Sequence, residues 1–161
     1  MVENFPSLSF IKDLARKAGE ILYSRSGTHH QVAYKGEIDL VTDVDRLSEQ
    51  LLIGEINRSF PDHQILAEES GEKSGLSCCR WYIDPLDGTV NYAHGIPIFC
   101  VSVAFAYEDE VRMGVIYDPM RDECYSAEKG KGAHLNGEPI HVSEVKELSR
   151  ALLVTGFPYD I

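Results

Sequence analysis

The sequence predicts an α+β fold in which helices pack on a largely antiparallel sheet. Two amphipathic helical stripes lie before Pro61, and short apolar runs separated by turn residues follow it. Links as short as those between the later runs join antiparallel neighbours. With 161 residues, 43% of them hydrophobic, the chain has the size and composition of one folded domain.

Two helices are predicted at the start of the chain. Between Leu8 and Leu22 the apolar residues recur at steps of three and one, which places them on one helical face. Ser7 can cap the start of this helix, and Gly27 follows its end. A second amphipathic pattern runs from Val44 to Phe60, immediately before Pro61. Both helices are expected to face the core.

The remainder of the chain has the pattern of short strands. Asn136 and Gly137 mark a tight reversal between two of the apolar runs. The predicted strands are Gln64 to Ala67, Trp81 to Ile83, Ile98 to Tyr107, Val111 to Tyr117, Glu123 to Ala127, Ala133 to Leu135 and Leu152 to Thr155.

Composition and charge restrict the partners and the compartment. A formal charge of -11 repels nucleic acid and anionic lipid surfaces, so neither is expected as a general partner. The excess of carboxylates fits a metal enzyme, and equally well an acidic surface that keeps a protein soluble. The four cysteines lack a CxxC spacing and are expected to be free thiols. No leader pattern or long apolar run is present, which predicts a cytoplasmic protein without a membrane span.

The segment from Trp81 to Tyr92 carries the most chemical information. An apolar strand delivers the carboxylates of Asp84 and Asp87 into a turn, where the Leu86 carbonyl adds a third oxygen suited to a hard cation. Gly88 and Thr89 then open a short helix, whose backbone amides suit a phosphate. The alternative is that Asp-Pro and Asp-Gly serve only as turn-forming pairs.

Two further acidic segments precede this one. Glu68 and Glu69 follow an apolar strand, and adjacent carboxylates repel one another unless solvent or a cation relieves them. Upstream, Thr42 and Asp45 have the spacing of a capping box before the second helix. Helix capping explains Asp45 by itself, although a capping residue can also take part in catalysis.

Together these segments resemble the inositol monophosphatase family, and its bacterial members in particular. The resemblance rests on residues 39–45, the glutamate pair at 68–69 and the run Asp-Pro-Leu-Asp-Gly-Thr that begins the stretch 84–97, in that order. It extends over essentially the whole chain. It implies the N-terminal half of a layered αβαβα sugar-phosphatase fold.

The resemblance also implies an activity. The expected function is Mg²⁺-dependent hydrolysis of a phosphate monoester, either inositol monophosphate or a related sugar phosphate, by direct attack of metal-bound water. Fructose-bisphosphatase, NADP phosphatase and nucleotide 3'-phosphatase activities of the same superfamily are alternatives. A different alternative is an inactive fragment that acts as a binding module, because some bacterial relatives associate with transcription machinery. A complete protein of this family is expected to be a homodimer.

Family roles transfer to particular residues of this chain. The implied Mg²⁺ ligands are the carboxylates of Glu68, Asp84 and Asp87 and the carbonyl of Leu86, with Asp84 shared between two ions. Gly88 and Thr89 match the phosphate-binding turn, and Thr89 with Asp45 matches the pair that activates the attacking water. Glu69 and Asp39 are expected to hold the metal ligands in place without binding the ions themselves. Lys35 falls near the outer site of the family, as Asp39 does.

One expected segment of the family is missing. The second half of the family carries a Trp-Asp-x-Ala-Ala-Gly segment whose aspartate completes the second metal site, whereas Trp81 is the only tryptophan of this chain. The chain is therefore expected to form an inositol monophosphatase-like N-terminal domain over residues 1–161, with the C-terminal α/β part absent. A polypeptide of this extent is expected to have little activity by itself.

Overall fold

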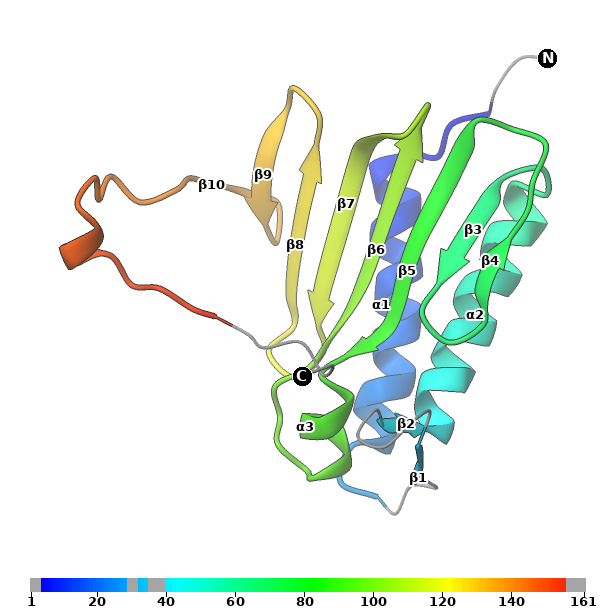
Figure 1. Cartoon of the computed structure of the whole chain (residues 1–161), viewed down its shortest axis with the longest axis horizontal. Helices are drawn as coiled ribbons and strands as arrows, with labels where there is room; N and C mark the ends of the chain where they lie inside the picture. Colours follow the sequence, from blue (N-terminus) through cyan, green and yellow to red (C-terminus); the bar gives the residue numbers. More distant parts are fainter. Residues whose placement is uncertain (1–3, 29–31, 35–39, 156–161) are drawn as a thin grey trace.

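The computed structural model describes residues 4–28, 32–34 and 40–155. In this part of the chain two long helices cover one face of an eight-stranded sheet (Figure 1). The helices are α1, Leu8–Arg25, and α2, Asp43–Ser59. The predicted α+β class, with helices on a mostly antiparallel sheet, is confirmed.

The sheet has the strand order β10-β9-β8-β7-β6-β5-β3-β4. Its strands are β3 Gln64–Ala67, β4 Gly71–Lys73, β5 Cys79–Asp87, β6 Cys100–Tyr107, β7 Glu110–Asp118, β8 Glu123–Glu128, β9 Gly132–Leu135 and β10 Glu138–Ile140. Neighbouring strands are antiparallel except β3 and β5, which run parallel because β4 turns back on the outer side of β3. Smaller elements are β1 Val32–Tyr34, β2 Leu40–Thr42, α3 Thr89–Ala93 and the 3₁₀ turn η1 Leu148–Arg150.

Both predicted helix starts are confirmed. The Phe10 amide donates to Ser7 Oγ over 3.1 Å at the start of α1. At the start of α2 the Thr42 hydroxyl and the Asp45 carboxylate form the reciprocal contacts of a capping box. The first helix ends at Arg25 with Ser26 as its C-cap, so Gly27 follows its end as predicted. No helix of the described ranges is long and apolar enough to cross a bilayer.

The core lies between the helices and the inner face of the sheet. Alternate residues of β5, β6 and β7 are buried against the apolar stripes of α1 and α2. A Cβ atom built on Gly19 would lie 2.5 Å from the Tyr117 ring, so α1 needs glycine where it meets β7. His63 is buried rather than solvated: it stacks on Phe60, and its Nδ1 accepts from the Trp81 indole over 3.0 Å.

One predicted strand is wrong. Residues 151–155 are irregular, and Leu152 and Val154 are fully exposed. A strand needs a hydrogen-bonded neighbour, and the chain that follows β10 runs away from the sheet within the described part (Figure 1). The predicted reversal at Asn136 and Gly137 is confirmed, because both residues have positive φ and join β9 to β10. Four three-residue strands, β1, β2, β4 and β10, were not predicted.

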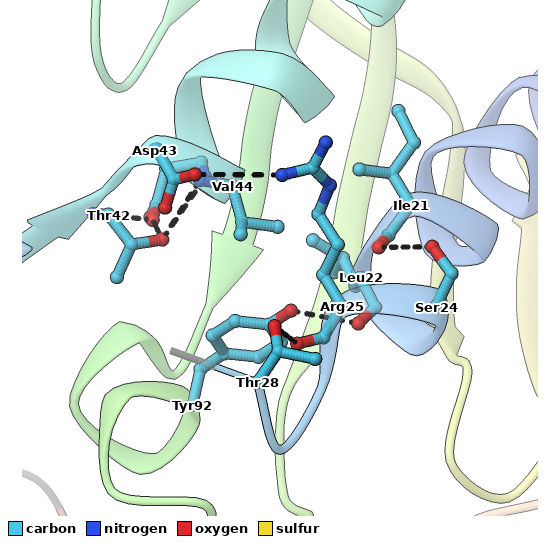
Figure 2. Close-up of polar contacts among 10 residues, drawn as sticks. Ile21, Leu22, Ser24, Arg25, Thr28, Thr42, Asp43, Val44 and Tyr92 are labelled. Atoms are coloured by element: carbon cyan, nitrogen blue, oxygen red, sulfur yellow. Dashed lines mark hydrogen bonds and ion pairs between the residues drawn. The ribbon is translucent and has the colours of Figure 1, made fainter. Parts of the chain in front are cut away.

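Polar contacts join the end of α1 to α2 and α3 (Figure 2). The Tyr92 hydroxyl, in α3, donates to the Leu22 carbonyl over 2.9 Å, and the Arg25 guanidinium lies 3.6 Å from the Asp43 carboxylate. The Tyr92 ring also packs edge-on against Phe99. These contacts fix α3 against the helical layer.

Replacing Tyr92 with phenylalanine is expected to destabilise the fold by about 0.5–1.5 kcal/mol, because the Leu22 carbonyl loses the hydroxyl donor and keeps the Ser26 amide, while the ring packing stays. Urea unfolding of both proteins measures the difference. Tyr23→Phe is the matched control, since Tyr23 is exposed on α1 and its replacement should leave the unfolding midpoint unchanged. Equal effects of the two substitutions would contradict the role given to Tyr92.

Candidate functional site

The carboxyl ends of β3 and β5 meet at one edge of the sheet. Because these strands are parallel, Glu68, which follows β3, lies beside the part of β5 that carries Asp84. The Glu68 amide donates to the Ile83 carbonyl over 3.2 Å, which fixes this relationship. The structure thus brings together acidic residues that lie 16 positions apart in the sequence.

A bulge in β5 separates its two aspartates. Asp84 pairs with Ser102 and Asp87 with Cys100, and the register shifts between the two pairs. Within the bulge the Leu86 amide donates to Asp84 Oδ1 over 3.1 Å. Leu86 is fully buried, so its side chain anchors the bulge in the core while its backbone stays at the acidic edge.

Asp45 and Thr89 are hydrogen-bonded to each other. Thr89 Oγ1 lies 3.1 Å from Asp45 Oδ1 and 3.0 Å from the Leu86 carbonyl oxygen. The other oxygen of Asp45 accepts from the amide and hydroxyl of Thr42. Capping and the contact with Thr89 therefore coexist, because each uses a different oxygen of one fully buried carboxylate.

Gly88 shapes the turn before α3. Its φ of 97° lies in the left-handed region, and a Cβ atom there would lie 2.9 Å from the Ile98 carbonyl oxygen. A larger residue is disfavoured for both reasons. The turn directs Thr89 back toward Asp45 at the start of the short helix.

The electrostatics of the acidic edge disfavour full ionisation. Burial, followed by the charge and hydrogen bond of Glu68 and the charge of Asp87, raises the pKa of Asp84 to about 8. Burial and the neighbouring Asp87 carboxylate raise the pKa of the Cys100 thiol to about 12, so this group donates to Asp87 as a neutral thiol. The acidic side chains of this edge therefore repel one another.

The donor set fits a hard divalent cation by its chemistry. Carboxylate and carbonyl oxygens are the ligands that Mg²⁺ takes in proteins, and a cation would relieve the repulsion that raises the Asp84 pKa. Within the described ranges no three acidic, histidine or cysteine side chains already lie close enough to hold a metal ion. Side-chain rotation, for which the exposed Asp87 has room, must therefore accompany binding.

The raised Asp84 pKa predicts a pH dependence of stability. Between pH 4 and 8 the folded metal-free protein keeps a proton that the unfolded chain, with an ordinary value of 3.8, releases. Stability should therefore fall as pH rises through this window. Urea unfolding in EDTA at pH 5 and pH 8 measures the fall, and Asp84→Asn should lessen it. If the Asp84→Asn variant has the same pH dependence of stability as the parent, Asp84 is not the group that causes it.

Three buried polar residues of α2 hold the site in place. Besides the contact between Asp45 and Thr89, Ser48 Oγ donates to the Pro85 carbonyl over 2.9 Å. The Glu49 carboxylate accepts from the Glu69 amide over 2.8 Å. Spacings of three and four place these α2 residues on one helical face. Ser48 and Glu49 were not predicted, because the sequence shows them only as polar residues beside an apolar stripe and does not reveal their partners.

The structure brings most of the predicted site residues together, and two of them lie outside the described residues. The structure gathers Glu68, Asp84 and Asp87 at one edge, and joins Thr89 to Asp45. Glu69 is tied to α2 through its backbone amide. Asp39 and Lys35 lie outside the described residues.

The fold and this edge define a class, an α+β protein with clustered acidic side chains beside a turn that opens a short helix. A model of the inositol monophosphatase family matches residues 4–160. The chain therefore belongs to the inositol monophosphatase family.

Individual relatives are similar over most of this chain. Nus factor SuhB of Escherichia coli is 41% identical over 96% of this chain and 59% of its own length. Inositol-1-monophosphatase of Synechocystis is 46% identical over 89% of this chain and 50% of its own. The solved inositol monophosphatase of Anabaena (Nostoc) superposes with a TM-score of 0.82 at 43% identity, covering 95% of this chain and 56% of the other. The chain thus spans between half and three-fifths of these relatives.

Proposed function

We propose that this chain forms the metal- and phosphate-binding part of a Mg²⁺-dependent phosphate monoester hydrolase that acts on inositol monophosphate or a related sugar phosphate. The observation that carries the proposal is Asp84, whose pKa is raised to about 8 by burial and by its neighbours Glu68 and Asp87. A carboxylate with a perturbed pKa inside an acidic cluster is typical of a functional site. Membership of a generally metal-dependent family supports the same conclusion.

The proposed Mg²⁺ ligands are the carboxylates of Glu68, Asp84 and Asp87 and the carbonyl of Leu86. When bound, the ions would neutralise the charge of the phosphoryl group and make a water molecule nucleophilic at neutral pH. Asp84 interacts with both Glu68 and Asp87, and is therefore proposed as the ligand that two ions would share. Glu69 is proposed to support Glu68, because its amide donates to Glu49 on α2 and so fixes the segment that follows β3.

Thr89 and Asp45 are proposed to orient the attacking water. With its proton directed to Asp45 Oδ1, the Thr89 hydroxyl presents its lone pairs to a water molecule and accepts a hydrogen bond from it. The buried Asp45 is held by Thr42, so it keeps this orientation without moving. Direct attack by water requires no covalent intermediate on the protein. The backbone of Gly88 and Thr89 is proposed to bind the phosphate oxygens.

The proposal is tested with a panel of phosphate monoesters, with and without Mg²⁺. Two proteins are assayed: this chain, and a chimera in which it is joined to the remaining C-terminal part of the Synechocystis inositol-1-monophosphatase, half of which the chain spans. The chimera is expected to hydrolyse inositol monophosphate only with Mg²⁺. A preference for fructose bisphosphate, NADP or a nucleotide 3'-phosphate would redirect the substrate assignment. A well-folded chimera that binds Mg²⁺ and hydrolyses none of them would contradict it.

A second candidate function is supported by the similarity to proteins named Nus factor SuhB. In that case the chain serves as a binding module for transcription machinery, and a pull-down set beside the phosphatase panel separates the two functions.

Two further parts of the proposal concern the whole protein. Family resemblance supports a homodimer, and the four free thiols support a cytoplasmic location.

A further inference from the structure

A cavity of about 540 Å³ lies between the residues that precede α1 and the strands β6, β7 and β8. Tyr107, which lines it, pairs with Cys79 at the start of β5, whereas Asp84 pairs with Ser102. Phe105, the lining residue of β6 closest to the acidic edge, lies three positions from Ser102, or roughly 10 Å at about 3.3 Å per residue. The cavity is distinct from the site described above.

Aromatic and aliphatic side chains form most of its walls. The Phe5 ring meets the Tyr107 and Phe105 rings edge-on, with centroids 5.0 and 5.9 Å apart. The apolar lining consists of Phe5, Pro6, Leu8, Phe105, Tyr107 and Met113. Phe5 is half exposed, so this wall is reachable from solvent. A planar apolar body of modest size fits such a space.

The charged lining is mostly basic. Arg112, Lys129 and Lys131 line the cavity together with a single carboxylate, that of Glu128. The guanidinium of Arg112 lies 5.9 Å from the Tyr107 ring centroid, which places positive charge beside the aromatic wall. Lys131 is paired with Glu128, and Lys129 shares Glu110 with Arg112, so three cations face two carboxylates. The one remaining positive charge favours an anionic ligand.

One donor of this lining has no acceptor in the described structure. The Nε–H of Arg112 is buried and lacks a hydrogen-bond partner there, although Nη2 contacts Glu110 over 2.9 Å. A buried donor without an acceptor is costly. The pair with Glu110 is exposed and easily exchanged. If the partly exposed Arg112 side chain turns toward the cavity, a carboxylate would satisfy Nε and engage the guanidinium through two parallel hydrogen bonds.

We infer that this cavity binds a small aromatic carboxylate, with its ring against Phe5 and Tyr107 and its carboxylate on Arg112. The ligand class follows from three features together, namely the aromatic walls, the basic lining and the orphaned Nε–H. The inference goes beyond the proposed phosphatase function and does not depend on it.

The test uses a matched pair of probes, 2-naphthoate and uncharged 2-naphthamide, titrated into the protein and followed by amide chemical shifts in β6 and β7. The naphthoate is expected to bind saturably and about tenfold or more tightly than the amide, because the charged hydrogen bonds to Arg112 are specific to it. Equal affinities for the two probes, or no saturable shift with either, would overturn the inference.

Variants separate the two parts of the site. Arg112→Gln should reduce naphthoate affinity to that of the amide, whereas Arg121→Gln, in the turn after the far end of β7, should keep the preference. Phe5→Ala should weaken both probes, because it removes the aromatic wall without touching the charge. Retention of the preference in a folded Arg112→Gln variant, or unchanged binding in Phe5→Ala, contradicts the inference.

Discussion

Replacing Asp84 with asparagine is expected to weaken Mg²⁺ or Mn²⁺ binding by roughly 100-fold or more. Loss of a residue that merely supports a metal ligand costs about 10- to 100-fold in affinity, and Asp84 is proposed as the ligand shared between ions. Asparagine keeps the size of the side chain and removes its charge. Calorimetric titration at pH 8, where the Asp84 proton competes less, measures the change.

The control for this experiment is Asp13→Asn. Asp13 is exposed on α1, and its replacement changes the net charge by the same amount. Metal affinity of this variant should match that of the parent. If both substitutions weaken binding equally, the effect comes from the overall charge, and Asp84 is not a ligand.

Thr89→Ala is expected to lower kcat of the Synechocystis chimera by roughly 100-fold, the lower end of what a positioned proton acceptor contributes. Mg²⁺ affinity should change by no more than about twofold, because the hydroxyl orients water and is not proposed as a principal ligand. The contact with Asp45 over 3.1 Å is the structural basis. Steady-state kinetics together with metal titration separate the two quantities.

Two further substitutions sharpen this prediction. Thr89→Ser restores the hydroxyl and should recover most of the turnover. Thr28→Ala removes the same groups from a residue whose hydroxyl donates to the Arg25 carbonyl near the end of α1, and should leave turnover unchanged (Figure 2). An unchanged kcat in Thr89→Ala would mean that Thr89 has only a structural role.

Local patterns predicted the parts of the fold that local forces determine. The strand Gln64–Ala67 was predicted with its observed bounds, and the two helices were found from their apolar stripes and caps. The edge strand Gly71–Lys73 was not found, because its three residues carry no apolar alternation and form a strand only through pairing with β3. The strand predicted from Leu152 to Thr155 is absent for the opposite reason. Its pattern is strand-like, but no neighbouring strand pairs with it within the described residues.

The candidate site shows a similar division. Motif order indicated the acidic residues that the parallel pairing of β3 and β5 brings to one edge. Ser48 and Glu49 could not be assigned in the same way, because their partners are backbone groups 37 and 20 positions away. Such contacts depend on which segments α2 crosses, and no local pattern contains that information.

The shared face of α2 makes the site behave as one cooperative unit. The helix contacts the β5 bulge, the segment after β3 and the start of α3 through neighbouring residues. The rotation of α2 about its own axis therefore determines where all three segments lie. Turning the helix by a single residue, about 100° at 3.6 residues per turn, would detach all three segments simultaneously. Under denaturant, the capacity to bind metal should therefore disappear together with the helical signal of α2, in one transition and without a partly competent intermediate.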